Sequence, residues 1–138
     1  MTLRPSLEAG LVAAVASGVP STVWTLLEGE DVLDGARAAG AIVLPRERRT
    51  PVLIAAAVPV HLAVSLGWAL LLGRLLPHRA EPLLGAAAGL AIAALDLGVI
   101  GRRIPAIRAL PQGRQWADHL AYGVAVGAVL KVRRDLAP

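Results

Sequence analysis

The sequence predicts an all-α polytopic membrane protein, with four transmembrane helices in an antiparallel bundle and a short interfacial helix between the first two. Two observations support this fold class. Of the 138 residues, 56% are hydrophobic, and the mean hydropathy is +0.62, which is more apolar than a water-soluble core requires. Four long apolar runs stand between short charged clusters, whereas the alternation of a β-barrel is absent. We expect one membrane domain over residues 1–138.

Four apolar runs meet or approach the length of about 20 residues that a transmembrane helix needs. The first contains Pro20, which can bend the helix where the hydroxyls of Ser17 and Ser21 satisfy the freed backbone groups. The fourth is short, and it spans fully only if Lys131 extends its amine to the membrane surface. The predicted spans are 7–27, 51–73, 82–100 and 116–131.

The connection from Glu28 to Thr50 is too long and too apolar for a plain loop. We expect residues 31–42 to form a short helix that lies at the membrane interface. Basic side chains at such a place can bind anionic lipid headgroups, here near Glu28 and Asp118. The candidates for this contact are Arg37, Arg46, Arg48 and Arg49.

Lysine and arginine residues flank the apolar runs and explain the net charge of +4, so nucleic acid is not an expected partner. Six of them lie on the side that carries both termini and eight on the opposite side, so this count does not set the orientation. The compact cluster Lys131, Arg133 and Arg134 favours cytoplasmic termini. The first run ends in acidic residues without a small-residue cleavage site, and we expect it to be a retained helix.

Three ionisable residues fall inside the spans, where each costs about 2.5–3.5 kcal/mol on insertion. From helix rise, His61 lies near the midplane, whereas Asp96 and His119 lie about 4–6 Å below the surface opposite the termini. Glu28 and Asp118 belong to that same surface. We expect Asp96 and His119 to face each other within hydrogen-bond or water-bridge distance, with His61 one to two turns deeper.

Helical spacing groups polar and small residues into one stripe on each span. Because polar groups avoid lipid, the stripes are expected to enclose a polar vestibule with His61 at its floor. Simpler interpretations stand beside this one: the glycines serve packing only, His61 donates to a carbonyl, and Asp96 pairs structurally with His119. The stripes are Ser17, Ser21, Thr25 and Glu28; His61, Ser65 and Trp68; Gly85, Gly89, Ala93 and Asp96; and His119, Gly123 and Gly127.

Three functional hypotheses follow. The vestibule could move or sense protons or a small ion through its histidine and carboxylate groups. The chain could instead be a non-catalytic component that packs against its own copy or a larger membrane complex. An enzyme acting on lipid or quinone is the third, although no phosphate loop, zinc-protease or serine-hydrolase motif is present.

No catalytic residue, cofactor or metal is assigned from the sequence. A bis-histidine haem needs two ligands at similar depth, whereas His61 and His119 are expected to differ by about 10 Å. A metal held by these histidines and Asp96 meets the same objection. The absence of cysteine excludes disulfides and thiolate metal sites.

The second half of the chain, from His61 to Asp135, carries a series of polar residues, glycines and prolines in a fixed order. The series begins with His61-x-x-x-Ser65 and continues through Asp96 to His119-Leu120. This order resembles the YagU-like family of small bacterial inner-membrane proteins. The resemblance implies a bacterial inner (plasma) membrane location and recurring mid-helix histidines, but no catalytic residue, because that family has no established biochemical activity. Members tend to have a histidine near the position of Asp96, and their first connection differs. The residues are His61-x-x-x-Ser65, Pro77, Gly85, Gly89, Asp96, Pro105, His119-Leu120 and Arg133-Arg134-Asp135-Leu136.

Overall fold

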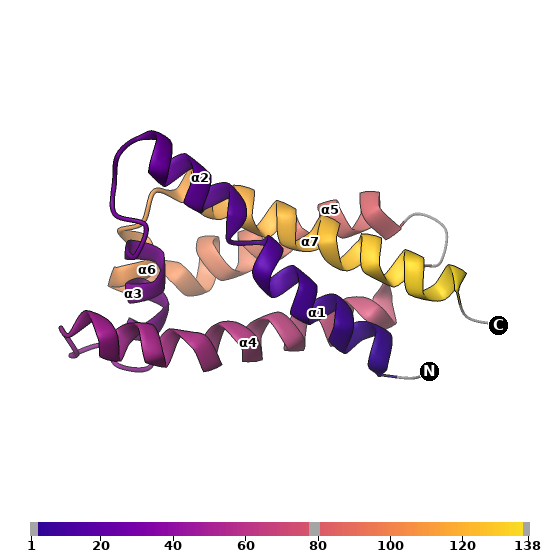
Figure 1. The fold of residues 1–138 in the computed structure, drawn as a ribbon, viewed down its shortest axis with the longest axis horizontal. Coiled ribbons are helices and arrows are strands. Elements are labelled where there is room, and N and C mark those ends of the chain that lie inside the picture. Colours follow the sequence, from indigo (N-terminus) through magenta and orange to yellow (C-terminus); the bar gives the residue numbers. More distant parts are fainter. Residues whose placement is uncertain (1–2, 78–80, 137–138) are drawn as a thin grey trace.

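The computed structural model describes residues 3–77 and 81–136, and these residues form helices without strands (Figure 1). The predicted all-α class is confirmed. A π-helical turn, η1, and a 3-10 turn, η2, extend the fifth α-helix. In chain order the elements are α1 (Arg4–Ala16), α2 (Val19–Leu27), α3 (Asp34–Ala41), α4 (Thr50–Leu75), α5 (Glu81–Leu95), η1 (Asp96–Ile100), η2 (Gly101–Arg103), α6 (Pro105–Arg108) and α7 (Gln112–Asp135).

Three helical segments in the described part of the chain are long and apolar enough to cross a membrane, judged by length and composition: Arg4–Leu27, Thr50–Leu75 and Pro82–Arg103. Large apolar side chains are exposed along them, including those of Val15 and Leu83. Water-soluble proteins rarely expose apolar surface on this scale. These features suggest a membrane protein. The helix α7 has a similar length but is more polar, and it does not meet the same criteria.

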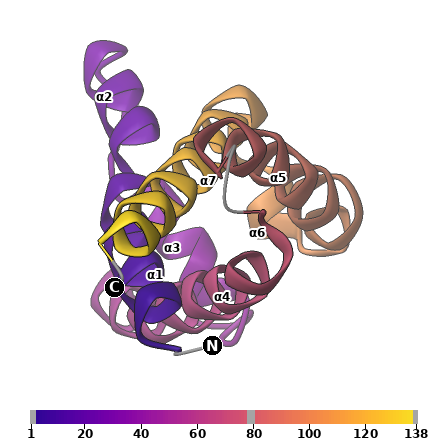
Figure 2. The same cartoon turned by 90° about the vertical axis from the view of Figure 1, so that its right-hand side faces the viewer.

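The first apolar run is broken rather than continuous. α1 ends at Ala16 and α2 begins at Val19, because Pro20 has no N–H to donate back along the helix. The hydroxyls of Ser17 and Ser21 donate to the carbonyls of Ala14 and Gly18, each at 3.4 Å. The bend predicted at Pro20 is therefore confirmed, and Figure 2 shows α2 leaning away from the other helices.

The helix α7 occupies the centre of the packing. It lies between α1 and α5, while α1 also packs on α4, and α3 lies across the first turns of α4 (Figures 1 and 2). By contrast, α4 and α5 make few direct contacts with each other. The start of α1 and the end of α7 lie at the same end of the molecule (Figure 1). The buried core comprises Ala9, Ala13, Ala69, Leu72, Leu76, Ile92, Tyr122, Val126 and Leu130.

Glycines allow a close contact between α5 and α7. A Cβ atom added at Gly85, Gly89 or Gly123 would lie within 3.0 Å of backbone atoms of the facing helix, a distance that real Cβ atoms essentially never show. The two backbones thus approach as closely as small residues permit. The structure supports the packing interpretation of this stripe.

The remaining predicted boundaries differ in detail. α3 is shorter than the predicted segment 31–42, and the backbone of Gly40 packs against the Leu53 carbonyl of α4. That this helix lies at a membrane interface stays a prediction. α7 begins at Gln112, four residues before the predicted start, and continues to Asp135. Arg79, counted above on the side of the termini, lies outside the described residues.

Candidate functional site

A cavity of about 460 Å³ lies between the α1–α2 break, α3, α4, the end of α5 and α7. Its size falls within the range of about 300–1,000 Å³ typical of small-molecule sites. Four of the five predicted pathway residues line it: His61, Asp96, Asp118 and His119. Other polar lining groups are Ser17, Ser21, Thr22, Ser65, Trp68, Gln115 and Tyr122. The vestibule predicted from the helical stripes thus has a counterpart in the structure.

Asp96 is the first residue of the π-helical turn, and π-helical turns often occur at functional sites. Its Oδ2 atom lies 3.6 Å from Nε2 of His119 and accepts the indole N–H of Trp68 at 3.2 Å. Asp96 and His119 therefore face each other across α5 and α7, as predicted. The indole contact itself was not predicted, although Trp68 lies on a stripe that was expected to face the vestibule.

The two ring nitrogens of His119 have different roles. Nδ1 lies 2.8 Å from the carbonyl oxygen of Gln115, one turn earlier on α7. Because a carbonyl can only accept, Nδ1 carries the proton of the neutral ring. Nε2 is then the nitrogen that takes up a further proton, and it faces Asp96. Protonation of His119 would turn this contact into an ion pair.

The same donor–acceptor argument assigns the two ring nitrogens of His61. Its Nε2 atom lies 2.8 Å from the carbonyl oxygen of Ala14, near the end of α1, and must donate to it. The carbonyl contact predicted for His61 is confirmed. Nδ1 is left as the nitrogen that can accept a proton, while the ring still lines the cavity.

Asp118 caps the second half of the broken first helix. Its Oδ1 atom accepts the backbone N–H of Ser21 at 2.8 Å. Ser21 lies in the first turn of α2, where backbone N–H groups have no partner within the helix. A carboxylate at this position satisfies one such donor and favours the positive end of the helix dipole. Asp118 thus links α7 to α2 at the edge of the cavity.

The helix ends used for the depth estimate differ from those in the structure. The chain continues in helical turns beyond Ile100, and α7 begins four residues earlier than predicted. Asp96 and His119 therefore lie further from their helix ends than assumed. That His61 lies one to two turns deeper than this pair stays a prediction.

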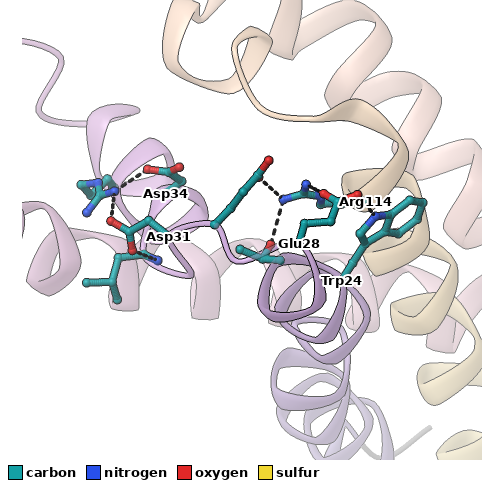
Figure 3. A network of polar contacts seen from close by, with 9 residues as sticks. Trp24, Glu28, Asp31, Asp34 and Arg114 are labelled. Carbon is teal, nitrogen blue, oxygen red and sulfur yellow. Dashed lines mark hydrogen bonds and ion pairs between the residues drawn. The ribbon is translucent and has the colours of Figure 1, made fainter.

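Glu28, the fifth predicted pathway residue, lies outside the cavity in a separate polar cluster (Figure 3). It forms an ion pair with Arg114, and its other oxygen accepts the indole N–H of Trp24 at 2.9 Å. Arg114 also donates to Glu30 at 2.7 Å and to Thr25 at 3.0 Å. The Arg114 side chain is only 8% exposed, so these groups rather than water are its main polar partners.

The turn after α2 brings Glu30 to this cluster. Gly29 has a positive φ of 68°, a conformation that side-chain-bearing residues rarely adopt. It ends α2 and directs Glu30 back toward α7. We call Thr25, Glu28, Glu30 and Arg114 the Arg114 cluster.

Arg37, a predicted headgroup ligand, pairs within its own segment. Its guanidinium lies 2.6 Å from Asp31 and also contacts Asp34 (Figure 3). The Arg37 guanidinium, together with the backbone N–H of Leu33, holds the pKa of Asp31 below its usual range. The positive charge expected to meet a headgroup is thus balanced by two carboxylates of the same connection.

The basic cluster before α4 is partly neutralised as well. Arg49 donates to Glu47 at 2.8 Å, and this contact, with the backbone N–H groups of Arg49 and Arg48, lowers the pKa of Glu47 to about 2. Glu47 therefore contributes to stability above pH 4.5, and the contribution is lost as the pH falls toward 2. The exposed Arg46 and Arg48 have no ion pair with the residues that the structure describes.

Sequence reasoning missed the Arg114 cluster and the polar roles of the tryptophans. One signal was available for the cluster: Glu28 and Glu30 follow the first span, and Arg114 precedes the fourth on the same side. No comparable signal exists for Trp68, because a tryptophan within an apolar run is typical of packing. Tyr122, whose hydroxyl donates to the Ser65 carbonyl, was missed for the same reason.

Within the described residues, no group of three or more histidine or acidic side chains is arranged to hold a metal ion. Comparisons with protein-family models, with curated proteins and with solved structures found no match.

Proposed function

We propose that this chain is a four-span membrane protein that binds protons in its central cavity and moves or senses them across the bilayer. The observation that supports this most is the grouping of His61, His119, Asp96 and Asp118 around one cavity. Histidine changes charge near neutral pH, and intramembrane carboxylates and histidines mark proton relays in pumps and transporters.

The hydrogen bonds support a role for each histidine in this proposal. Both rings donate one N–H to a backbone carbonyl and keep one nitrogen for an incoming proton. A proton on His119 is stabilised by Asp96, which lies 3.6 Å from Nε2. His61, bound to α1, is the second acceptor in the same cavity. Two acceptors in one cavity are the minimum for passing a proton from one side chain to another.

The proposal includes α7 as the fourth span. Its 24 residues reach about 36 Å, which exceeds the hydrocarbon thickness of about 30 Å. Its polar residues have interior partners: Arg114 in its cluster, Asp118 on Ser21 and His119 on Asp96. Their low hydropathy is therefore compatible with burial in a membrane bundle. In the same proposal, α3 lies at the interface, the termini are cytoplasmic, and the membrane is a bacterial inner membrane.

Proton flux into liposomes tests this function. We expect the reconstituted protein to dissipate an imposed pH gradient, reported by an enclosed pH-sensitive dye. His61→Ala should reduce the flux to the level of protein-free liposomes. His61→Gln is the sharper variant, because its amide can still donate to the Ala14 carbonyl but cannot carry a proton at neutral pH.

The matched control is Gln112→Ala, at the first turn of α7 and outside the cavity lining. It should leave the flux unchanged. Circular dichroism should show equal helix content in all variants. Unchanged flux in a folded His61→Gln protein would remove His61 from the mechanism, and no flux in the wild-type protein would exclude transport.

A second candidate is a non-catalytic component that packs against another membrane protein or its own copy. The observation in its favour is the exposed face of α4, where Ala63 and Gly67 are exposed one turn apart and Gly67 has open space at its Cβ position. Small residues at this spacing are typical of membrane helix contacts. Purification in mild detergent as a monodisperse 14.2 kDa monomer without other subunits would count against this role.

A further inference from the structure

The cavity has the charge of a cation site. Its described lining includes the carboxylates of Asp96 and Asp118 but no lysine or arginine. The titratable groups that face it from α4, η1 and α7 are His61, Asp96, Asp118, His119 and Tyr122. When the carboxylates are ionised and both histidines are neutral, the lining carries two negative charges. Such charges in a membrane interior require compensation by protons or by another cation.

The remaining lining fits the apolar body of an organic molecule. Apolar side chains from α3 to α6 contribute most of it, among them Ile54, Val58, Val64, Ile92 and Ile107. Trp68 and Tyr122 belong to the same lining, and aromatic faces attract organic cations. A bare metal ion needs neither this volume nor these groups. The arrangement combines an apolar pocket with a few convergent polar groups, as ligand sites usually do.

We propose that the cavity binds a small organic cation, such as an amine or quaternary ammonium with an apolar body, in competition with protons. This inference rests on the proposed function, because the histidines and carboxylates proposed to bind protons are the same groups that would bind the cation. Protons on His61 and His119 and a bound cation compensate the same two negative charges. Binding of the cation therefore releases protons, and its affinity rises with pH.

Calorimetric titration of the purified protein in detergent tests the proposal. The probe is benzyltrimethylammonium, whose charge is independent of pH, and benzenesulfonate is the anion of similar size. We expect saturable binding of the cation alone, with an affinity at least about tenfold lower at pH 5.5 than at pH 8, because the histidines become protonated in this range. Equal binding of both ions, or no binding of the cation at pH 8, would overturn the proposal.

Variants locate the site. Asp96→Asn and Asp118→Asn should each weaken binding of benzyltrimethylammonium at least about tenfold. Asparagine keeps an oxygen that can accept the N–H of Trp68 or Ser21, so the folds should be retained. Asp135→Asn, which removes an exposed carboxylate at the far end of α7, should bind as the wild type does. Equal affinity in all three variants would place the cation elsewhere and overturn the inference.

Failure of this inference can be distinguished from failure of the proposed function. Proton uptake is measured separately, by following the histidine ring signals in NMR spectra as the pH is lowered without any probe. If His61 and His119 titrate but the cation does not bind, the ligand class is wrong and the proton function stands. If the histidine signals do not change with pH, the proton function fails. If the cation binds with the same affinity at every pH, its competition with protons is wrong.

Discussion

Arg114 illustrates how a single charged residue is held in an apolar protein. Its guanidinium is 8% exposed, whereas its partners Glu28 and Glu30 are 46% and 51% exposed. The planar guanidinium has five N–H donors in a fixed fork, whereas the ammonium of a lysine has three. Since Thr25, Glu28 and Glu30 come from α2 and the turn after it, one side chain joins the end of α2 to the start of α7.

Removing this guanidinium should destabilise the protein. In Arg114→Met, the loss of three charge-assisted hydrogen bonds should lower the free energy of unfolding by about 1–3 kcal/mol. The loss stays below that of a fully buried pair because both glutamates can regain water. The free energy of unfolding of Arg114→Lys should lie between those of Arg114→Met and the wild type. Thermal unfolding in detergent measures the effect, and Arg108→Met, at an exposed arginine, is the control. An equal loss of stability in both variants would contradict the role of the cluster.

The positions of the helices were predicted well from the sequence, but the polar contacts between them were not. Apolar length located the helices, and the proline and two serines located the break in the first one, because these signals are local. The contacts of Trp68 and Arg114 join residues far apart in the sequence, so no spacing rule could reveal them. The proximity of Asp96 and His119 was predictable because two adjacent spans brought them to similar depth, although both lie further from their helix ends than assumed.

The glycine contact between α5 and α7 gives a prediction about helix packing. A methyl group at Gly123 would meet the backbone of Gly85 and Gly89, which cannot move aside as a flexible side chain could. Gly123→Ala should therefore destabilise the protein by about 1–3 kcal/mol, as overpacking does. Gly67→Ala is the matched control, since the new Cβ would meet no atom within 4 Å and helix propensity improves.

Thermal unfolding of the two variants in detergent separates packing from propensity. Gly67→Ala should be as stable as the wild type or slightly more stable, and Gly123→Ala less stable than both. If Gly123→Ala unfolded at the wild-type temperature, α5 and α7 would not be in the close contact that the structure shows. The wall of the cavity formed by Asp96 and His119 would then lose its support.

For the whole molecule, the number of membrane spans decides which functional interpretation can hold. Length and composition identify three candidate membrane spans. The cavity also requires α7, because α7 carries Asp118 and His119. In the proposed four-span arrangement, hydropathy undervalues this helix, because it counts every polar residue equally, whether that residue faces lipid or the interior. The start of α1 and the end of α7 lie at the same end of the molecule (Figure 1), which agrees with the even number of spans proposed.

This difference is testable, because four spans place the termini on the same side of the membrane and three place them on opposite sides. The chain has no cysteine, so single substitutions give unambiguous labelling. In sealed vesicles of either orientation, a membrane-impermeant maleimide should label the exposed Leu3→Cys and Leu136→Cys from the cytoplasmic face. Arg46→Cys, exposed before α4, should be labelled only from the other face. Labelling of Leu3→Cys and Leu136→Cys from opposite faces would show that α7 does not cross, and the proton and cation proposals would then fail together.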